Sequence, residues 1–267
     1  MIIIGELINT SREGVEPAVK ERDKEFIQDL AKKQEEVGAD YIDVNCGTLI
    51  KEEPEALEWL VKTVQEVVDV PLCIDSPNPE ALKRGLEAYE HEKGAIINSI
   101  TAEEERYEQI LPLLQEYNAS VVALAMDDSG MPKNADDRIN VATKLVEALI
   151  DDGISMENIY VDPIVQPIGT DVKMGIEILN AIDTITDKYE DIHITCGLSN
   201  ISHGLPMRRL LNQTYVVLGM SRGMDSAILD PLDEKIMSLA IAGDTLLGND
   251  KYCGNYIKAA KSNKLTI

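Results

Sequence analysis

The stretch YIDVNCGTLIKEEPEALEWLVKTVQEVVDVPLCIDS, residues 41–76, contains one complete strand–helix–strand unit. It opens on the apolar, β-rich run YIDVN (41–45) and closes on PLCIDS (71–76). Between these runs, EALEWLVKTVQEVV (55–68) places apolar residues at helical spacing, with Glu and Lys between them. Continuous apolar strands that alternate with helices pair in parallel and are covered on both faces. The stretch therefore predicts an α/β fold with a parallel sheet.

The same unit recurs along the whole chain. The short apolar runs are IIIGE (2–6), YIDVN (41–45), PLCIDS (71–76), AIINS (95–99), SVVALAM (120–126), NIYVD (158–162), HITCGLS (193–199) and SAILD (226–230). Helical text lies between them, and Gly38, Gly153 and Gly248 follow such text, where a left-handed C-terminal cap is expected. Eight such units close into a (β/α)8 TIM barrel.

A doubly wound open sheet is the alternative architecture. Such a sheet usually carries a GxGxxG fingerprint after its first strand, and the corresponding stretch here, GELINTSREG (5–14), has none. No Pro/Gly/Ser-rich linker interrupts the chain. We therefore expect residues 1–267 to form a single barrel domain, with residues 249–267 as a C-terminal extra helix or arm.

Composition narrows the classes of function. The chain has 267 residues and a net charge of -23, which argues against a nucleic acid or an anionic membrane as partner. The opening MIIIGE is too short and too soon polar for a signal peptide, and no run of 18 apolar residues occurs, so a cytoplasmic protein is expected. The four cysteines have no CxxC spacing, which predicts reduced, packed thiols.

Polar residues mark the end of almost every predicted strand. They are Glu6 and Asn9, Asp43 and Asn45, Asp75, Asn98, Asp162, Ser199 with Asn200, and Asp230; only Met126 breaks the series. A helix N-cap explains such a residue at one strand, and capping remains an alternative for Asp75 and Asn98. It explains less well why nearly all eight ends are polar. Because these ends converge on one face of a barrel, we expect a shared site there.

The types of residue at this face restrict the ligand. No strand ends in Lys, which argues against a Schiff-base enzyme, and the three histidines have no metal-triad spacing, so no protein-bound metal is predicted. The nearby basic residues are few: Arg12, Arg208 and Arg209. A carboxylate offers two adjacent acceptors, and an amide offers one acceptor and one donor. A pterin ring, with adjacent N–H donors, fits this set; the similar edge of guanine keeps a purine open as an alternative.

The stretch HITCGLSNISHG (193–204) combines a thiol, hydroxyls and two imidazoles around Asn200. In a barrel, HITCGLS is a strand, so Cys196 is expected to pack in the core and His193 to lie at the far, structural face. Ser199 has no base beside it in the sequence and is interpreted as a loop-shaping residue. Asn200, in the middle of the stretch, carries an amide and cannot act as a proton-transfer base.

The chain resembles the methyltetrahydrofolate:corrinoid protein methyltransferases, pterin-binding barrels of acetogenic and related anaerobic methyl-transfer pathways. The matching text is IIGELIN (3–9), KKQEEVGADYIDVNCG (32–47), EWLVKTVQEV (58–67), LCIDS (72–76), INS (97–99), IYVDPIV (159–165), GLSNIS (197–202) and DSAILD (225–230). The match covers nearly the whole chain, in order and with similar spacing. Methionine synthase carries a similar folate module within a much longer protein.

The resemblance implies the role of each matching residue. The implied pterin-binding residues are Asp43, Asn45, Asp75, Asn98, Asp162, Gly197, Ser199, Asn200 and His203. Within this set, Asn200 and Asp162 are implied to be catalytic: the amide of Asn200 would reach N5 of the folate, and Asp162 would hold a water that carries the proton. His203 stands where the family pattern has a glutamine, which puts in doubt how that edge of the site meets the pterin or the corrin.

The resemblance also implies substrates and partners. Methyltetrahydrofolate or tetrahydrofolate would be the substrate, and cobalamin would arrive on a separate corrinoid protein, because the chain has no DxHxxG-like cobalamin module. A homodimer is the usual assembly of this family. Two alternatives remain: a dihydropteroate synthase-like enzyme, which should carry a Lys after a GFSRK-like seventh strand where this chain has CGLSN (196–200), and a non-catalytic folate-binding protein.

Overall fold

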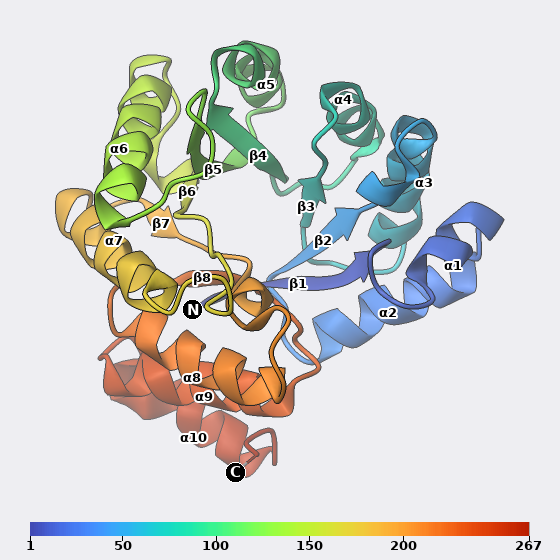
Figure 1. Cartoon of the computed structure of the whole chain (residues 1–267). Helices are drawn as coiled ribbons and strands as arrows, with labels where there is room; N and C mark the ends of the chain where they lie inside the picture. The colour runs from blue at the N-terminus through green and yellow to red at the C-terminus, as the bar shows by residue number, and fades with distance from the viewer. Residues whose placement is uncertain (267) are drawn as a thin grey trace.

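The computed structural model describes residues 1–266 and has the expected (β/α)8 architecture. Figure 1 shows the strands as a ring with the helices outside it. The strands are β1 (Ile2–Asn9), β2 (Tyr41–Asn45), β3 (Leu72–Asp75), β4 (Ile96–Ala102), β5 (Ser120–Asp127), β6 (Ile159–Asp162), β7 (His193–Ile194) and β8 (Ser226–Leu229). All pair in parallel in the order β7-β6-β5-β4-β3-β2-β1-β8.

The helices follow the strands as the amphipathic text predicts. They are α1 (Val15–Glu21), α2 (Lys24–Glu36), α3 (Glu53–Gln65), α4 (Pro79–Ala88), α5 (Glu104–Tyr117), α6 (Ala135–Asp151), α7 (Met174–Lys188), α8 (Arg208–Met220), α9 (Glu234–Leu246) and α10 (Gly254–Lys261). Gly38, Gly153 and Gly248 have positive φ just beyond α2, α6 and α9, so the predicted glycine caps are confirmed.

The seventh strand is shorter than the sequence suggests. The expectation of a strand over residues 193–199 is wrong beyond Ile194, because the chain enters a 3-10 turn, η3 (Leu198–Ser202), in which the N–H of Asn200 donates to the carbonyl of Gly197 over 3.2 Å. The segment just after β7 is joined to β8 by a backbone hydrogen bond, in which the N–H of Ile228 donates to the carbonyl of Cys196 over 2.9 Å. The barrel is therefore nearly closed, with a weak seam at this point.

The interior of the barrel changes from apolar to polar along the strands. The layer nearer the amino ends of the strands is a buried cluster of Ile4, Cys73, Ile96, Val122 and Tyr160. Two residues further along four of these strands come Glu6, Asp75, Asn98 and Asp162. Residues i and i+2 of a strand point to the same face, so these polar side chains occupy the next layer toward the carboxyl ends. A far larger aliphatic core fills the space between strands and helices.

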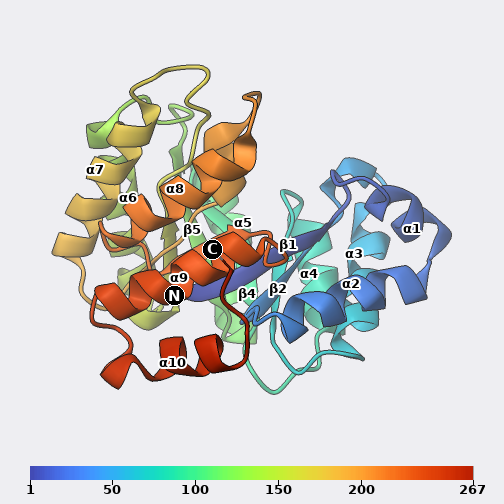
Figure 2. The ribbon, with the colours of Figure 1, turned by 90° about the horizontal axis from the view of Figure 1, so that it is seen from below.

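The C-terminal arm returns to the barrel. Figures 1 and 2 both show α10 alongside α9. The N–H of Thr266 donates to Oγ of Ser238 over 2.8 Å, and its hydroxyl donates to Glu234 over 2.9 Å. The expected extra helix is thus present as α10, while the single-domain assignment stays a prediction and residue 267 lies outside the described residues.

Two further properties follow from the side chains of the described residues. Cys46, Cys73 and Cys196 are buried, Cys253 is exposed, and all four are free thiols, which confirms the predicted packing of Cys196. Within residues 1–266, no helix combines the length and the apolar character that a membrane crossing needs.

Candidate active site

Asp75 ends β3 and is held by a neighbouring strand. Its Oδ2 accepts a hydrogen bond of 2.7 Å from the side-chain amide of Asn45, whose Oδ1 accepts from the N–H of Gly47 over 3.0 Å. Burial raises the pKa of Asp75 to about 6, against the opposing effect of the Asn45 hydrogen bond. The cap of α4 is Asn78, which accepts from the N–H of Glu80, so Asp75 is not that helix cap.

Asp43 and Asn98 flank Asp75 on the neighbouring strands. Asn98 pairs with Asp75 in the β3–β4 register. Asp43 precedes Asn45 by two residues on β2 and pairs with Cys73. Asp43 is 1% exposed, and its Oδ1 has no hydrogen-bond partner among residues 1–266. Burial, and then the charge of Asp75, raise the pKa of Asp43 well above its usual range. The environment therefore favours a protonated carboxyl beneath Asp75.

Asp162 faces these residues from the end of β6. It is 8% exposed, and its Oδ1 accepts a 2.7 Å hydrogen bond from the N–H of Ile164. Burial raises the pKa of Asp162 to about 6, opposed by hydrogen bonds from the N–H groups of Ile164 and Gly197. Burial thus raises the pKa of both Asp75 and Asp162, so each becomes neutral at a higher pH than an ordinary aspartate.

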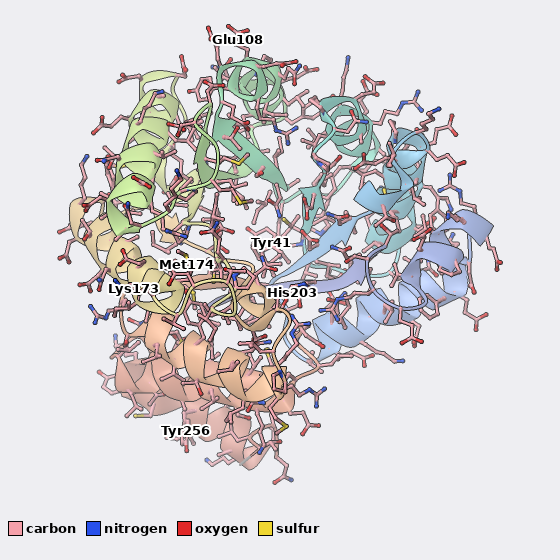
Figure 3. All side chains as sticks on the ribbon, in the orientation of Figure 1. Tyr41, Glu108, Lys173, Met174, His203 and Tyr256 are labelled. Atoms are coloured by element: carbon pink, nitrogen blue, oxygen red, sulfur yellow. The ribbon has the colours of Figure 1, made fainter. Side chains whose placement is uncertain are left out.

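Asn200 lies on the η3 turn above this layer, and a glycine gives its side chain room. A Cβ atom added at Gly197 would come within 2.9 Å of Nδ2 of Asn200. The turn is fixed by Arg208, whose guanidinium donates to the carbonyl of Ser199 over 2.8 Å. His203 donates its N–H to the carbonyl of Asn200 over 3.1 Å and has an exposed side chain. Figure 3 labels His203 over the inside of the ring, near β1 and β8.

A cavity of about 580 Å³ opens beside this turn. Its lining residues are Glu6, Asn9, Ser11, Arg12, Leu198, Ser199, Asn200, His203, Arg208, Arg209, Asn212, Leu229, Asp230, Asp233 and Ile236. Glu6 belongs both to this lining and to the polar layer inside the barrel. Arg12 forms an ion pair with Glu6 and lies 3.8 Å from Asp230. Burial raises the pKa of Glu6, and the charge of Arg12 opposes that rise.

The structure therefore brings the predicted residues to one end of the barrel in two adjoining groups. Ser199, Asn200 and His203 line the cavity, whereas Asp75, Asn98 and Asp162 lie in the polar layer at the centre of the ring. His193 sits at the start of β7, at the opposite end, where its Nδ1 lies 2.7 Å from Asp225, as expected for a structural histidine.

Two polar residues that support this layer were missed by sequence reasoning. Glu53 is 2% exposed and accepts a 2.5 Å hydrogen bond from the hydroxyl of Ser76, directly after Asp75. Arg106 donates to the carbonyls of Ser76 and Ser99 over 2.9 and 2.7 Å, and so ties the segment after β3 to β4. Both come from the first turns of helices, where charged residues are normally solvent-exposed, so the strand-end pattern gave no signal for them.

The site is built for hydrogen bonding. Within residues 1–266, no group of three or more His, Cys, Asp or Glu side chains converges as metal ligands. Three carboxyl groups, of Glu6, Asp75 and Asp162, and the amide of Asn98 form a polar layer, and the amide of Asn200 lines the adjoining cavity. Such a layer suits a flat heterocycle with adjacent N–H groups.

The chain belongs to the family of pterin-binding enzymes, whose family model matches residues 5–230. Over 267 residues it is 40% identical to the methylcorrinoid:tetrahydrofolate methyltransferase of Eubacterium limosum, covering 99% of this chain and 98% of that protein. The family expected from the sequence is thereby confirmed. Methionine synthase of Mycobacterium tuberculosis is 29% identical over 243 residues, which are 86% of this chain and 20% of that longer protein.

Solved structures agree in fold. Dihydropteroate synthase from Xanthomonas albilineans, solved with 6-chloroguanine and indole-2-carboxylic acid, matches with a TM-score of 0.70 and 17% identity over 94% of this chain and 92% of that chain. The enzyme from Thermus thermophilus matches with a TM-score of 0.69 and 17% identity, over 90% and 92% of the two chains. At this identity the likeness concerns the barrel alone.

Proposed function

We propose that this protein is a methyltransferase that moves a methyl group between a corrinoid and N5 of tetrahydrofolate. The observation that carries the proposal is an amide donor, Asn200, on the turn after β7, where it lines a cavity that shares Glu6 with the polar layer inside the barrel. The relative from Eubacterium limosum, 40% identical along the whole chain, is named for the same substrates. Its name gives the direction methylcorrinoid to tetrahydrofolate, and we adopt that direction here.

In this proposal the polar layer holds the pterin. Asp75 and Asp162, each with a pKa of about 6, are ionised at neutral pH and accept the adjacent N–H donors of the ring. Asn98 serves O4 and the neighbouring edge, and Asn45 keeps Asp75 oriented through its 2.7 Å hydrogen bond. Asp43 forms the floor beneath Asp75. The gain in binding comes from pairing carboxylates whose burial is otherwise costly.

Asn200 acts on the atom that gains or loses the methyl group. The corrinoid supplies a cobalt that releases methyl while keeping the bonding electron pair, or takes methyl in the reverse direction. In the forward direction N5 forms the new N–C bond and loses its proton, and in reverse N5 must receive negative charge as that bond breaks. An amide suits both, because its oxygen accepts from N5–H and its NH2 donates to the nitrogen lone pair. A water held by Asp162 passes the proton to or from solvent.

The corrinoid is proposed to arrive on a separate protein. The cavity beside Asn200 is open at the mouth, and the sequence contains no cobalamin-binding motif of its own. His203, exposed at this rim, would face the incoming partner. A homodimer is part of the same proposal and is tested by the mass of the protein in solution.

The decisive experiment is spectroscopic. The protein is mixed with methylcob(III)alamin, free and protein-bound, and tetrahydrofolate, and the appearance of cob(I)alamin is followed; the reverse mixture starts from methyltetrahydrofolate. We expect Asn200→Ala to lower kcat by about 100- to 1000-fold, the loss of about 2.7–4 kcal/mol typical of a transition-state donor, with a small change in folate affinity. Asn180→Ala, on the exposed side of α7, is the control.

The outcomes separate the alternatives. Turnover within a few-fold of wild type in Asn200→Ala would refute the role of this amide. Folate binding by the wild type without transfer to or from any corrinoid would favour the non-catalytic folate-binding protein. Condensation of a pterin pyrophosphate with p-aminobenzoate would favour the dihydropteroate synthase-like enzyme.

A further inference from the structure

Arg138 is a buried cation with no carboxylate beside it. It lies in the first turn of α6 and is 0% exposed. Among residues 1–266 no carboxylate oxygen comes within 4.0 Å of it, and its Nε has no hydrogen-bond partner. Burial lowers the pKa of Arg138. Burying a charge without a counterion costs free energy. The neutral groups that Arg138 binds therefore indicate its role.

The guanidinium of Arg138 binds the segment that follows β6. Its Nη2 donates to Oε1 of Gln166 over 2.8 Å and to the carbonyl of Ile164 over 3.3 Å, and lies 3.6 Å from Sδ of Met174 at the start of α7. Its Nη1 donates to the carbonyl of Asn134 over 3.0 Å. Figure 3 labels Met174 at this end of α7. Arg138 thus fastens the β6–α7 segment to α6.

The fastened segment contains a backbone conformation that its residue does not favour. Ile164 has a φ of 61° although it is β-branched, and it is 7% exposed. A left-handed conformation at such a residue costs about 1–3 kcal/mol and persists only where the surroundings enforce it. The hydrogen bond from Arg138 to the carbonyl of Ile164 is one such constraint.

This strained residue leads directly to the proposed catalytic groups. The N–H of Ile164 donates to Oδ1 of Asp162 over 2.7 Å. Four residues on, the N–H of Ile168 donates to the carbonyl of Ile201 over 3.1 Å, and Ile201 is the neighbour of Asn200 in η3. The segment after β6 therefore contacts the side chain of Asp162 and the turn that carries Asn200.

We propose that Arg138 is a positioning residue for methyl transfer, which keeps Ile164 in its left-handed conformation and thereby aims Asp162 at the pterin. The inference rests on the proposed function, since it assigns Arg138 to the same site. Arg138 does not touch the substrate in this scheme: it acts through the main chain of Ile164 and through its charge.

The charge gives a readout that a purely structural role would not give. Cys196 and Tyr215 also face Asp162, and burial raises the pKa of both well above neutrality, so both are uncharged from pH 5 to 8. Glu177 and Asp137 act on Arg138 from α7 and α6. The cation lowers the pKa of Asp162. Because Asp162 must be ionised to accept from the pterin, removing the cation should make folate binding fail at a higher pH.

The test measures tetrahydrofolate binding by calorimetry from pH 5 to 8.5 in the wild type and three variants. Arg138→Met should weaken binding at pH 8 by about 10-fold and move the acid limb of the binding curve to higher pH. Ile164→Gly in the Arg138→Met background should restore affinity at pH 8, because glycine adopts positive φ without penalty, while the limb stays shifted. Arg138→Lys should give the opposite result: the acid limb of the binding curve stays at its wild-type pH because the charge remains, and the affinity at pH 8 falls.

Circular dichroism and thermal unfolding accompany each variant. A folded Arg138→Met with wild-type affinity and an unmoved limb would overturn the inference and leave the proposed function intact. Wild-type protein that transfers no methyl group would instead refute the proposed function. If Arg138→Met does not fold, Arg138→Lys decides. A loss of tetrahydrofolate affinity of about 10-fold, with no shift in the pH at which binding fails, supports the positioning role of Arg138. Wild-type affinity in Arg138→Lys overturns that role. The matched surface control is Lys144→Met on α6.

Discussion

Substituting Gly197 by alanine should disable the site without harming the fold. The added methyl group would lie 2.9 Å from Nδ2 of Asn200 and 3.7 Å from its Cγ. An ordinary contact needs about 0.5 Å more, so the amide must retreat by about that distance or rotate away. Gly197 has a φ of -69°, which alanine adopts readily, so the backbone itself is not strained.

The expected effect follows from this geometry. A reacting group misplaced by about 1 Å costs about 100-fold in rate, so a shift of about half that distance should lower kcat by about 10- to 100-fold. The melting temperature should stay within about 4 °C of wild type, since a compatible Gly→Ala change is worth at most about 1 kcal/mol. Folate affinity should change little, because the carboxyl layer is untouched.

The measurement pairs the spectroscopic transfer assay with thermal unfolding. Gly175→Ala is the control, because its added methyl group meets Cγ2 of Ile168 at an ordinary 3.6 Å. Full activity in Gly197→Ala would show that the amide position does not matter. A large loss of stability in Gly197→Ala would show that the glycine serves the fold and would remove the argument.

Two further predictions concern the polar layer. Asp162 has a folded pKa of about 6 against a usual value of 3.8, so it costs stability above pH 6 and that cost disappears as the pH falls toward 4. Asp162→Asn should therefore raise the free energy of unfolding by up to about 3 kcal/mol at pH 8 and leave it unchanged near pH 4, in urea titrations; a less stable variant at pH 8 would contradict this sign. Arg106→Met should lower stability by about 2–3 kcal/mol and weaken tetrahydrofolate binding, because it leaves loop carbonyls unpaired. Arg84→Met, which loses only surface ion pairs, should change the free energy of unfolding by less than about 0.5 kcal/mol; equal losses in the two variants would argue against a special role for Arg106.

The sequence predicts the barrel well because two local signals agree. Strand text such as YIDVN (41–45) matches β2 from end to end, and helical text over 55–68 matches α3 (Glu53–Gln65) to within three residues at each end. The positions of Asp75 and Asp162 at strand ends also predict a shared face, and in the structure both lie two residues beyond the buried Cys73 and Tyr160. These assignments need only neighbouring residues.

The sequence fails where a contact joins distant elements. HITCGLS (193–199) has strand composition, yet hydrogen bonds within the turn end the strand at Ile194. Arg138 and Arg106 look like ordinary charges in first turns of helices; their partners, such as the carbonyls of Ile164 and Ser76, belong to other units of the barrel. No spacing rule in the chain connects them, so only the assembled fold reveals their roles.

The two-residue length of β7 has a consequence for how pterin barrels diverge in evolution. Beyond Ile194 the segment is tied to β6 through the N–H of Thr195 and to β8 through the carbonyl of Cys196, so substitutions between Gly197 and α8 leave the strand pairs intact. A barrel of the same shape, at 17% identity, serves the dihydropteroate synthases. New reactions in this fold can therefore arise by rewriting one short segment, the one that contains Asn200, while selection for folding acts on the other seven strands.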